Sequence, residues 1–250
     1  MSHLNNSFRS IAVDAAQTFF RLFGLQISYF NPSNSEIALI DYLLSKYNIK
    51  TVVDVGANEG QFALKLLNKN YYKGKIISFE PVSSSFQQLL KNSQQASNWA
   101  VVQCAVGDST GQVPINISQN SVSSSLRKVN AHTVEAEAGT AIVNTEMVSI
   151  NTLDTLLKAH QWQNDLWLKI DVQGFEREVL QGASETLKQA KVVQIELAVI
   201  PSYEQSPYLE EIIATMRASG FLLYSIMNGF RNYKTGQMYE MEGFFIRDNS

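Results

Sequence analysis

Two acidic residues stand where parallel strands of a sheet would end. Asp171 follows the apolar run 166–170, and Glu196 lies near the end of the run 190–197. Open α/β sheets bind ligands at the carboxyl ends of their strands, and neighbouring strands lie about 4.8 Å apart, so both carboxylates can converge on one ligand, metal or proton. Structural alternatives stay open, because Asp171 can accept hydrogen bonds from the next turn and Glu196 can pair with Lys169.

A glycine-containing turn is the second group with chemical potential. The β-branched run 51–55 leads into Gly56, Asn58 and Gly60, and a helical segment follows. Glycines let a ligand approach the backbone, and the free N–H groups of the next helix attract that ligand. A dinucleotide turn needs a glycine where Asn58 stands, whereas Glu80, twenty residues after Gly60, is placed to bind ribose hydroxyls. An adenosine ligand without a pyrophosphate, such as S-adenosylmethionine, satisfies both features; an ordinary strand-to-helix turn is the structural alternative.

Strands and helices are expected to alternate and to position these residues. The patterns predict strands at 51–55, 75–80, 99–106, 166–170, 190–197, 221–227 and 241–247, and helices at 36–47, 62–67, 83–92, 175–180 and 208–218. This alternation implies an α/β fold with a doubly wound, mostly parallel sheet and right-handed crossovers. The closing pair of strands is compatible with an antiparallel strand inserted at one edge.

The segment 107–150 interrupts the alternation. It contains probable strands at 111–117 and 141–150 around a polar loop, and we interpret it as a β insertion over the sheet edge. Long irregular segments of compact domains are often functional. His132 lies in this insertion, where a lone histidine is either a solvated side chain or a general base.

Residues 1–48 are predicted to form a helical extension packed on a core domain at 49–250. Apolar side chains recur at helical spacing through 8–23. Such a stripe packs on the main domain or on a partner copy, and the alternative is a helix on a membrane surface. Arg9 and Arg21 are the only cations of its polar face, which argues against an anionic lipid surface.

The overall composition narrows the class of protein. The 250 residues are 45% hydrophobic and 17% charged, with a net charge of −3, which predicts a globular chain and argues against general nucleic-acid binding. The single cysteine, Cys104, allows no intrachain disulfide. The sequence shows no clean signal peptide and no run near the ~20 apolar residues that span a bilayer, so we predict a cytoplasmic protein.

Several motifs in order resemble the FkbM family of methyltransferases over about residues 51–196. They are the segments 53–60, 79–81, 148–154 and 168–176, with 179–183 and 194–196. The resemblance implies a class I methyltransferase that uses S-adenosylmethionine. It also implies a seven-stranded Rossmann-like sheet with six parallel strands and an antiparallel last strand.

The same resemblance implies a set of cofactor-binding residues. The candidates are Asp54, Gly56, Asn58, Gly60, Glu80 and Asp108. The turn from Gly56 to Gly60 would line the methionine part, Glu80 would bind the ribose, and Asp108 would reach the adenine amine. Family members methylate hydroxyl groups of sugars or natural products, which favours O-methylation, although the residues alone do not select oxygen over nitrogen.

Acceptor activation is assigned to the two strand-end acids. An alcohol is a poor nucleophile unless a base takes its proton or a metal lowers its pKa. Asp171 and Glu196 are therefore the candidate catalytic residues, as a base or as ligands of a Mg²⁺-type ion. The expected partner is a small-molecule or glycan hydroxyl acceptor, with a homo-oligomer as a further option. The alternatives are a non-catalytic methyltransferase-like binding module and an NAD-dependent oxidoreductase, which would lack its middle glycine.

Overall fold

The computed structural model describes residues 13–25, 30–68, 72–160, 162, 164–232 and 235–248. The chain divides into two compact units, Met1–Leu43 and Leu44–Ser250. In the first unit residues 13–21 are helical, and the earlier part of the predicted amphipathic helix lies outside the described residues. Helix α2 (Glu36–Lys46) spans the boundary. Packing of an N-terminal extension on the core stays a prediction.

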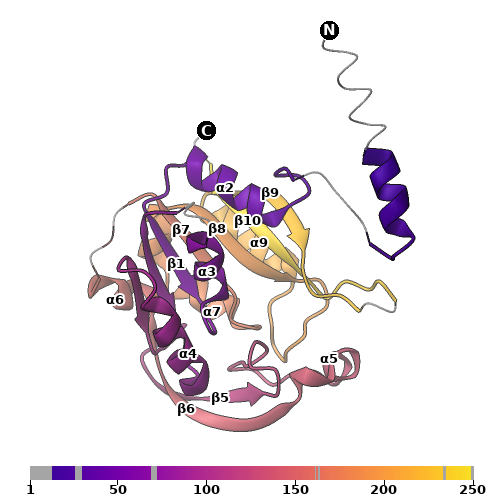
Figure 1. Ribbon diagram of the computed structural model, residues 1–250. Coiled ribbons are helices and arrows are strands. Elements are labelled where there is room, and N and C mark those ends of the chain that lie inside the picture. The colour runs from indigo at the N-terminus through magenta and orange to yellow at the C-terminus, as the bar shows by residue number, and fades with distance from the viewer. Residues whose placement is uncertain are drawn as a thin grey trace. The chain divides into compact units, whose positions relative to one another are not determined.

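Seven strands form the main sheet of the second unit, in the order β3-β2-β1-β7-β8-β10-β9 (Figure 1). They are β1 (Thr51–Val55), β2 (Lys75–Phe79), β3 (Trp99–Val102), β7 (Leu166–Ile170), β8 (Ala190–Ala198), β9 (Phe221–Asn228) and β10 (Glu240–Arg247). Strand β10 is antiparallel to both of its neighbours, and the other pairs are parallel. The predicted doubly wound sheet, with one antiparallel strand inserted near its edge, is therefore confirmed. Strands β1 and β7 are buried along their whole length, which explains their nearly continuous apolar sequences.

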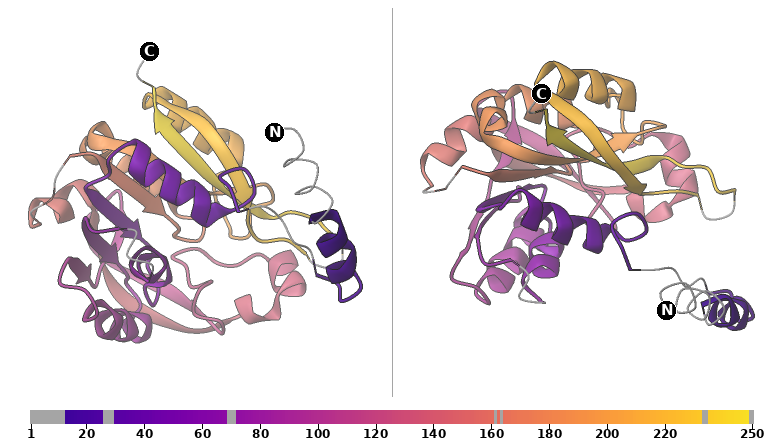
Figure 2. Two further views of the ribbon diagram at one scale, coloured as in Figure 1. Left: turned by 45° about the horizontal axis from the view of Figure 1, so that its top comes forward. Right: turned by 90° about the horizontal axis from the view of Figure 1, so that it is seen from above.

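Helices cover both faces of the main sheet, and the two faces differ in character. Figure 2 shows the sheet between α9 on one side and α3 and α4 on the other. The helices are α3 (Gln61–Leu67), α4 (Ser83–Ser93), α6 (Leu153–Lys158), α7 (Glu176–Gln181), α8 (Ser184–Gln189) and α9 (Leu209–Ala218). Apolar side chains of α6 to α9 form the main core with alternate strand residues such as Val53, Leu168 and Val193. The intervening strand residues on the other face include Asp54, Lys169 and Gln194, which are partners across the strands.

The predicted third strand, 99–106, is wrong as one element, because it is split between two sheets. Strand β3 ends at Val102, and β4 (Ala105–Gly107) pairs instead with β6 (Ile142–Thr152). The ladder between β2 and β3 ends where the Glu80 N–H donates to the Val102 carbonyl. The next residue of that chain is Pro81, which has no N–H to continue the ladder.

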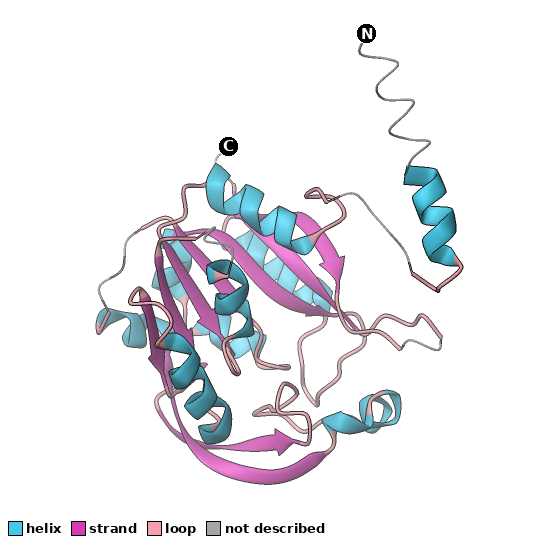
Figure 3. Ribbon diagram, in the orientation of Figure 1, coloured by secondary structure: helices cyan, strands magenta, loops and turns pink. Residues whose placement is uncertain are grey.

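The insertion forms a three-stranded sheet of order β4-β6-β5, in which β5 is Gly111–Ser118 (Figure 3). The two strands predicted within 107–150 are thus confirmed. A small apolar core that includes Val82, Ile115 and Val148 lies beneath this sheet. Between β5 and β6 the chain forms α5 (Ala131–Ala136) and a 3₁₀ turn (Ala138–Thr140). Across the described part of the chain, no helix has the length and apolar character needed to cross a membrane.

Candidate functional site

The glycine turn after β1 is shaped by close contacts within the protein. Gly56 has a φ of 82°, and a Cβ there would lie 1.8 Å from the carbonyl oxygen of Asp171. Gly60 has a φ of 89°, and its Cβ would lie 2.6 Å from the Trp99 ring. Asn58 between them also has a positive φ, of 48°. Both glycines are therefore required by the close approach of Asp171 and Trp99 to the turn, whatever ligand the turn also binds.

Glu80 is attached to this turn by its carboxylate. It follows β2, is only 5% exposed, and accepts hydrogen bonds of 2.8 Å from the backbone N–H groups of Asn58 and Val82. Burial raises the pKa of Glu80 to about 7, against these two hydrogen bonds, which lower it. A carboxylate offers about four lone-pair positions, so Glu80 can accept two further hydrogen bonds.

Lys169 on β7 lies between two of the predicted acids. Its Nζ is 3.0 Å from Asp171 Oδ2 and 3.6 Å from Asp54 Oδ1. Burial alone would lower the pKa of Lys169, but the carboxylates of Asp171 and Asp54 outweigh it and hold this pKa above its usual value. Asp54 is fully buried, and burial raises its pKa despite the attraction of Lys169. Lys169 therefore pairs with Asp171 and Asp54, and not with Glu196 as the structural alternative had it.

Asp171 and Glu196 are brought together by one amide group. The Nε2 of Gln173 donates to Asp171 Oδ1 at 2.8 Å and to Glu196 Oε2 at 3.0 Å. The expectation that these two carboxylates converge at the ends of neighbouring strands is thus met. The catalytic roles of Asp171 and Glu196 stay predictions, and the convergence of the two carboxylates is compatible with them.

Glu196 has a strongly acidic surrounding. Glu242 is its direct partner across the β8–β10 ladder, and Glu240, on the same strand as Glu242, is buried. Like charges that face each other across a sheet are unfavourable. Burial is the main cause that raises the pKa of Glu196 well above its ordinary value, and the nearby Glu240 carboxylate is the second. Glu196 is therefore a stronger proton acceptor than an ordinary glutamate.

Two sequence candidates lie apart from this cluster. Asp108 is exposed in the turn between β4 and β5, whereas the other seven predicted site residues belong to or follow strands of the main sheet. The contact of Asp108 with adenine stays a prediction. His132 in α5 stacks on Tyr239, with ring centroids 5.8 Å apart. Among the described residues no group of three or more His, Cys, Asp or Glu side chains is arranged to hold a metal ion.

Three residues of the site were missed by the sequence reasoning. Gln173 bridges the two acids, Tyr203 donates a 2.7 Å hydrogen bond to Gln173 Oε1, and Glu240 adds charge beside Glu196. Gln173 stands two residues after Asp171 in the turn of the motif at 168–176, and Glu240 begins the last strand. Position next to a motif residue was thus the available signal for Gln173. Tyr203 gave none, because it lies in a loop whose path depends on the fold.

Comparison with known proteins places this geometry in a family. The profile of the methyltransferase FkbM domain matches residues 54–223. Methyltransferase sdnD of Sordaria araneosa is 28% identical over 196 residues, which cover 68% of this chain and 73% of that protein.

Two solved structures resemble this chain to different degrees. Methyltransferase FkbM from Methylobacillus flagellatus KT superposes with a TM-score of 0.52 at 15% identity, over 78% of this chain, and the matched region spans 44% of that protein's length. Magnesium protoporphyrin IX methyltransferase from Synechocystis PCC 6803, solved with bound SAM, gives a TM-score of 0.47 at 11% identity, with 85% of this chain and 78% of that one covered. The profile match extends over more than half of the chain and includes both the glycine turn and the paired acids. The chain therefore belongs to the FkbM family of methyltransferases.

Proposed function

We propose that this protein is an S-adenosylmethionine-dependent O-methyltransferase that acts on a hydroxyl group of a sugar, a glycan or another natural product. The observation that carries this proposal is the pair of carboxylates, Asp171 and Glu196, held by one amide at the strand ends next to the glycine turn. Such a pair suits an acceptor that must lose a proton when it is methylated.

The residues around the turn fit an adenosine cofactor. Glu80 is buried, fixed by two backbone N–H groups, and retains lone pairs for a ribose diol. The turn from Gly56 to Gly60 would lie along the methionine part. When bound, S-adenosylmethionine supplies a methyl group that the sulfonium already activates. Asp54 is covered by protein and acts on this site through Lys169.

The environments of the two acids give them different roles. Asp171 is already paired with the Lys169 ammonium at 3.0 Å, so its carboxylate is assigned to orient the acceptor. Glu196 has a raised pKa and is assigned as the general base. Glu196 would take the proton of the acceptor hydroxyl. The methyl group would come from the sulfonium, whose methyl–sulfur bond breaks so that S-adenosylhomocysteine leaves as a neutral thioether. Asp171 orients the acceptor oxygen for this transfer.

Cofactor binding is the first test. Calorimetric titration with S-adenosylhomocysteine should give micromolar binding, and NAD should give none. Binding of NAD alone would support an oxidoreductase and overturn the proposal. Binding of neither by a folded sample would favour a binding module without chemistry. With binding established, transfer of labelled methyl groups to hydroxylated and amino acceptors, with and without Mg²⁺, tests the acceptor class.

Variants of the two acids test the mechanism. Glu196→Gln keeps the shape but not the base, and it should lower kcat by about 100- to 10,000-fold, the usual contribution of general base catalysis. Asp171→Asn should also lower kcat while S-adenosylhomocysteine affinity persists. Glu204→Gln is the matched control, since Glu204 is exposed and outside the site. Near-normal turnover by both site variants would contradict the assignment.

A further inference from the structure

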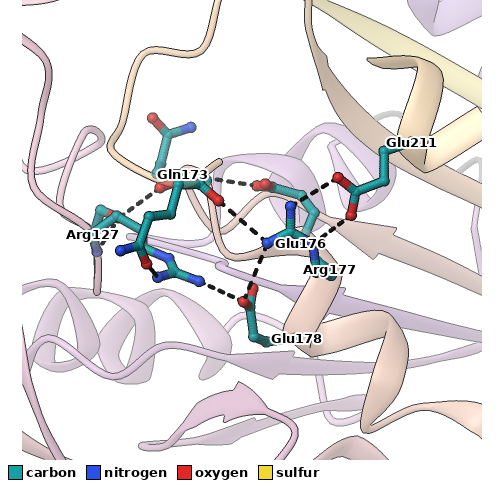
Figure 4. A network of polar contacts seen from close by, with 9 residues as sticks. Arg127, Gln173, Glu176, Arg177, Glu178 and Glu211 are labelled. Carbon is teal, nitrogen blue, oxygen red and sulfur yellow. Dashed lines mark hydrogen bonds and ion pairs between the residues drawn. The ribbon is translucent and has the colours of Figure 1, made fainter. Parts of the chain in front are cut away.

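The turn after β7 has an unusual backbone at Gln173. This residue has a φ of 57°, and Gly174 follows with a φ of 93°. Positive φ is uncommon for a residue other than glycine, and such residues persist where their surroundings over-determine them. Here Glu176 contributes, because its Oε1 accepts hydrogen bonds from the backbone N–H groups of Gly174 at 3.1 Å and of Val172 at 3.4 Å. Figure 4 shows Gln173 in this turn with Glu176 beside it.

The Gln173 amide uses both of its donors and one of the two lone pairs of its oxygen. A glutamine has two N–H donors and one carbonyl oxygen. Both donors point at carboxylates, one on Asp171 and one on Glu196, and the oxygen accepts from the Tyr203 hydroxyl at 2.7 Å. A neutral donor group between two like charges lets them approach without neutralising either one. Asp171 is held on its other oxygen by Lys169, so the amide fixes Glu196 relative to a residue that is already immobile.

Tyr203 decides which way this amide points. The Tyr203 side chain is buried, at 3% exposure, and its hydroxyl has two acceptors within reach, Gln173 Oε1 and the Ser123 carbonyl at 3.0 Å. Donation to Gln173 holds the amide oxygen away from the carboxylates and leaves both N–H groups facing them. The reverse orientation would set the amide oxygen against two acids, which is unfavourable.

The insertion holds the same turn from its other side. Ser125 Oγ donates to the Gln173 backbone carbonyl at 2.5 Å. Arg127 forms an ion pair with Glu178 of α7 and lies over the Phe175 ring, 5.0 Å from its centroid. The loop between β5 and α5 therefore fixes both the backbone and the flanking helix of the residue that bridges the acids.

We propose that Gln173 is a positioning residue that sets the geometry of the Asp171–Glu196 pair, and that Tyr203 together with the insertion loop 123–127 fixes Gln173 in turn. This proposal rests on the proposed methyl transfer, because Gln173 is the residue that would align Glu196, the general base of that reaction. The insertion thereby becomes part of the acceptor side of the site. Acceptor contacts with loop 123–127 would be transmitted to the base through a single side chain.

Titration of Glu196 tests this proposal without any acceptor. The titratable groups that act on Glu196 are Asp171 after β7, Glu176 of α7, Glu240 and Glu242 of β10, and Tyr203. A hydrogen bond donated to a carboxylate favours its ionised form. Loss of the Gln173 donor should therefore move the Glu196 midpoint to higher pH, by about one pH unit, in carboxyl ¹³C NMR.

Three variants separate positioning from folding. Gln173→Ala removes the amide. Gln173→Asn keeps an amide and tolerates positive φ, but its side chain is one methylene too short to bridge both acids. Both should shift the midpoint upward, and Tyr203→Phe should shift it less and in the same direction. Tyr208→Phe, an exposed tyrosine outside the site, is the control and should leave it unchanged.

Kinetics complete the test once an acceptor is known. Gln173→Asn should lower kcat by about 100-fold, the cost of a misplacement of ~1 Å, while S-adenosylhomocysteine affinity stays within about twofold. The acidic limb of its pH profile should move to higher pH. If Glu196 titrates with the wild-type midpoint in both Gln173 variants, the positioning role is overturned, even where the wild-type protein transfers methyl groups. Failure of the wild type to bind S-adenosylhomocysteine would instead overturn the proposed function.

Discussion

Replacing Lys169 with methionine should leave Asp54 as an uncompensated charge inside the sheet. Lys169 is nearly buried and Asp54 fully so, and Asp54 has no hydrogen-bond partner for either carboxylate oxygen among the described residues. Its interaction with Lys169 at 3.6 Å is therefore its main stabilising contact. Removing one partner of a buried ion pair costs about 3–5 kcal/mol. At about 2–4 °C per kcal/mol for a domain of this size, Tm should fall by roughly 6–20 °C.

The loss should depend on pH in a defined direction. The folded-state pKa of Asp54 is raised, so protonation favours the folded state, and removal of Lys169 raises this pKa further. The stabilising effect of Lys169 itself is fully present below the ordinary pKa of lysine, because its folded-state pKa is also raised. The stability difference between wild type and Lys169→Met should therefore be smaller at pH 5 than at pH 8.

Urea unfolding at these two pH values, followed by tryptophan fluorescence, measures the difference. The double variant Asp54→Asn with Lys169→Met removes the stranded charge and should recover most of the loss. Asp171, the other partner, is partly exposed and can be solvated, so it contributes less to the cost. The reasoning is refuted if the single variant loses less than about 1 kcal/mol at pH 8, or if the double variant is no more stable than the single one.

Three further predictions follow from local geometry. Gly56→Ala should destabilise the fold and abolish S-adenosylhomocysteine binding, because the added Cβ would overlap the Asp171 carbonyl. Gly111→Ala is the control: its Cβ would enter open space, so both the melting temperature and the calorimetric affinity should stay close to those of the wild type. The affinity for S-adenosylhomocysteine should fall as the pH drops through about 7, because Glu80 takes up a proton there. In the same calorimetric series, Glu80→Gln should bind S-adenosylhomocysteine weakly at every pH. Asp154→Ala should cost about 1–2 kcal/mol in urea unfolding, because the Asp154 carboxylate accepts hydrogen bonds from the first backbone N–H groups of α8; unchanged stability would contradict this capping role.

Much of the main sheet could be predicted because its inner strands are short, apolar and β-branched. Strands β1 and β7 form where buried strands were predicted, since burial on both faces leaves a clear signal in sequence. The strand predicted at 99–106 failed for a non-local reason. Its apolar pattern continues past Gln103, but its neighbour β2 ends at Phe79, two residues before Pro81. No local pattern reveals which strand is the neighbour.

The site could be predicted to the level of its strand-end acids and no further. Asp171 and Glu196 were found because strand ends converge at one edge of a parallel sheet. The pairing of Lys169 with Asp54 could not be predicted, because the choice of Asp54 over Glu196 depends on the cross-strand register. The role of Gln173 depends on a positive φ and on Tyr203, thirty residues away, and neither is encoded in local spacing.

The interior place of β10 has a consequence for how the chain acquires its structure. Among the described residues, β10 is the last strand along the chain, yet it lies between β8 and β9 and supplies the only ladder that joins β9 to the sheet. During synthesis β8 would wait with an open edge until residues 240–247 leave the ribosome. An unpaired apolar edge is a template for aggregation, so the last strand to be synthesised is also the one that covers the open edge of β8.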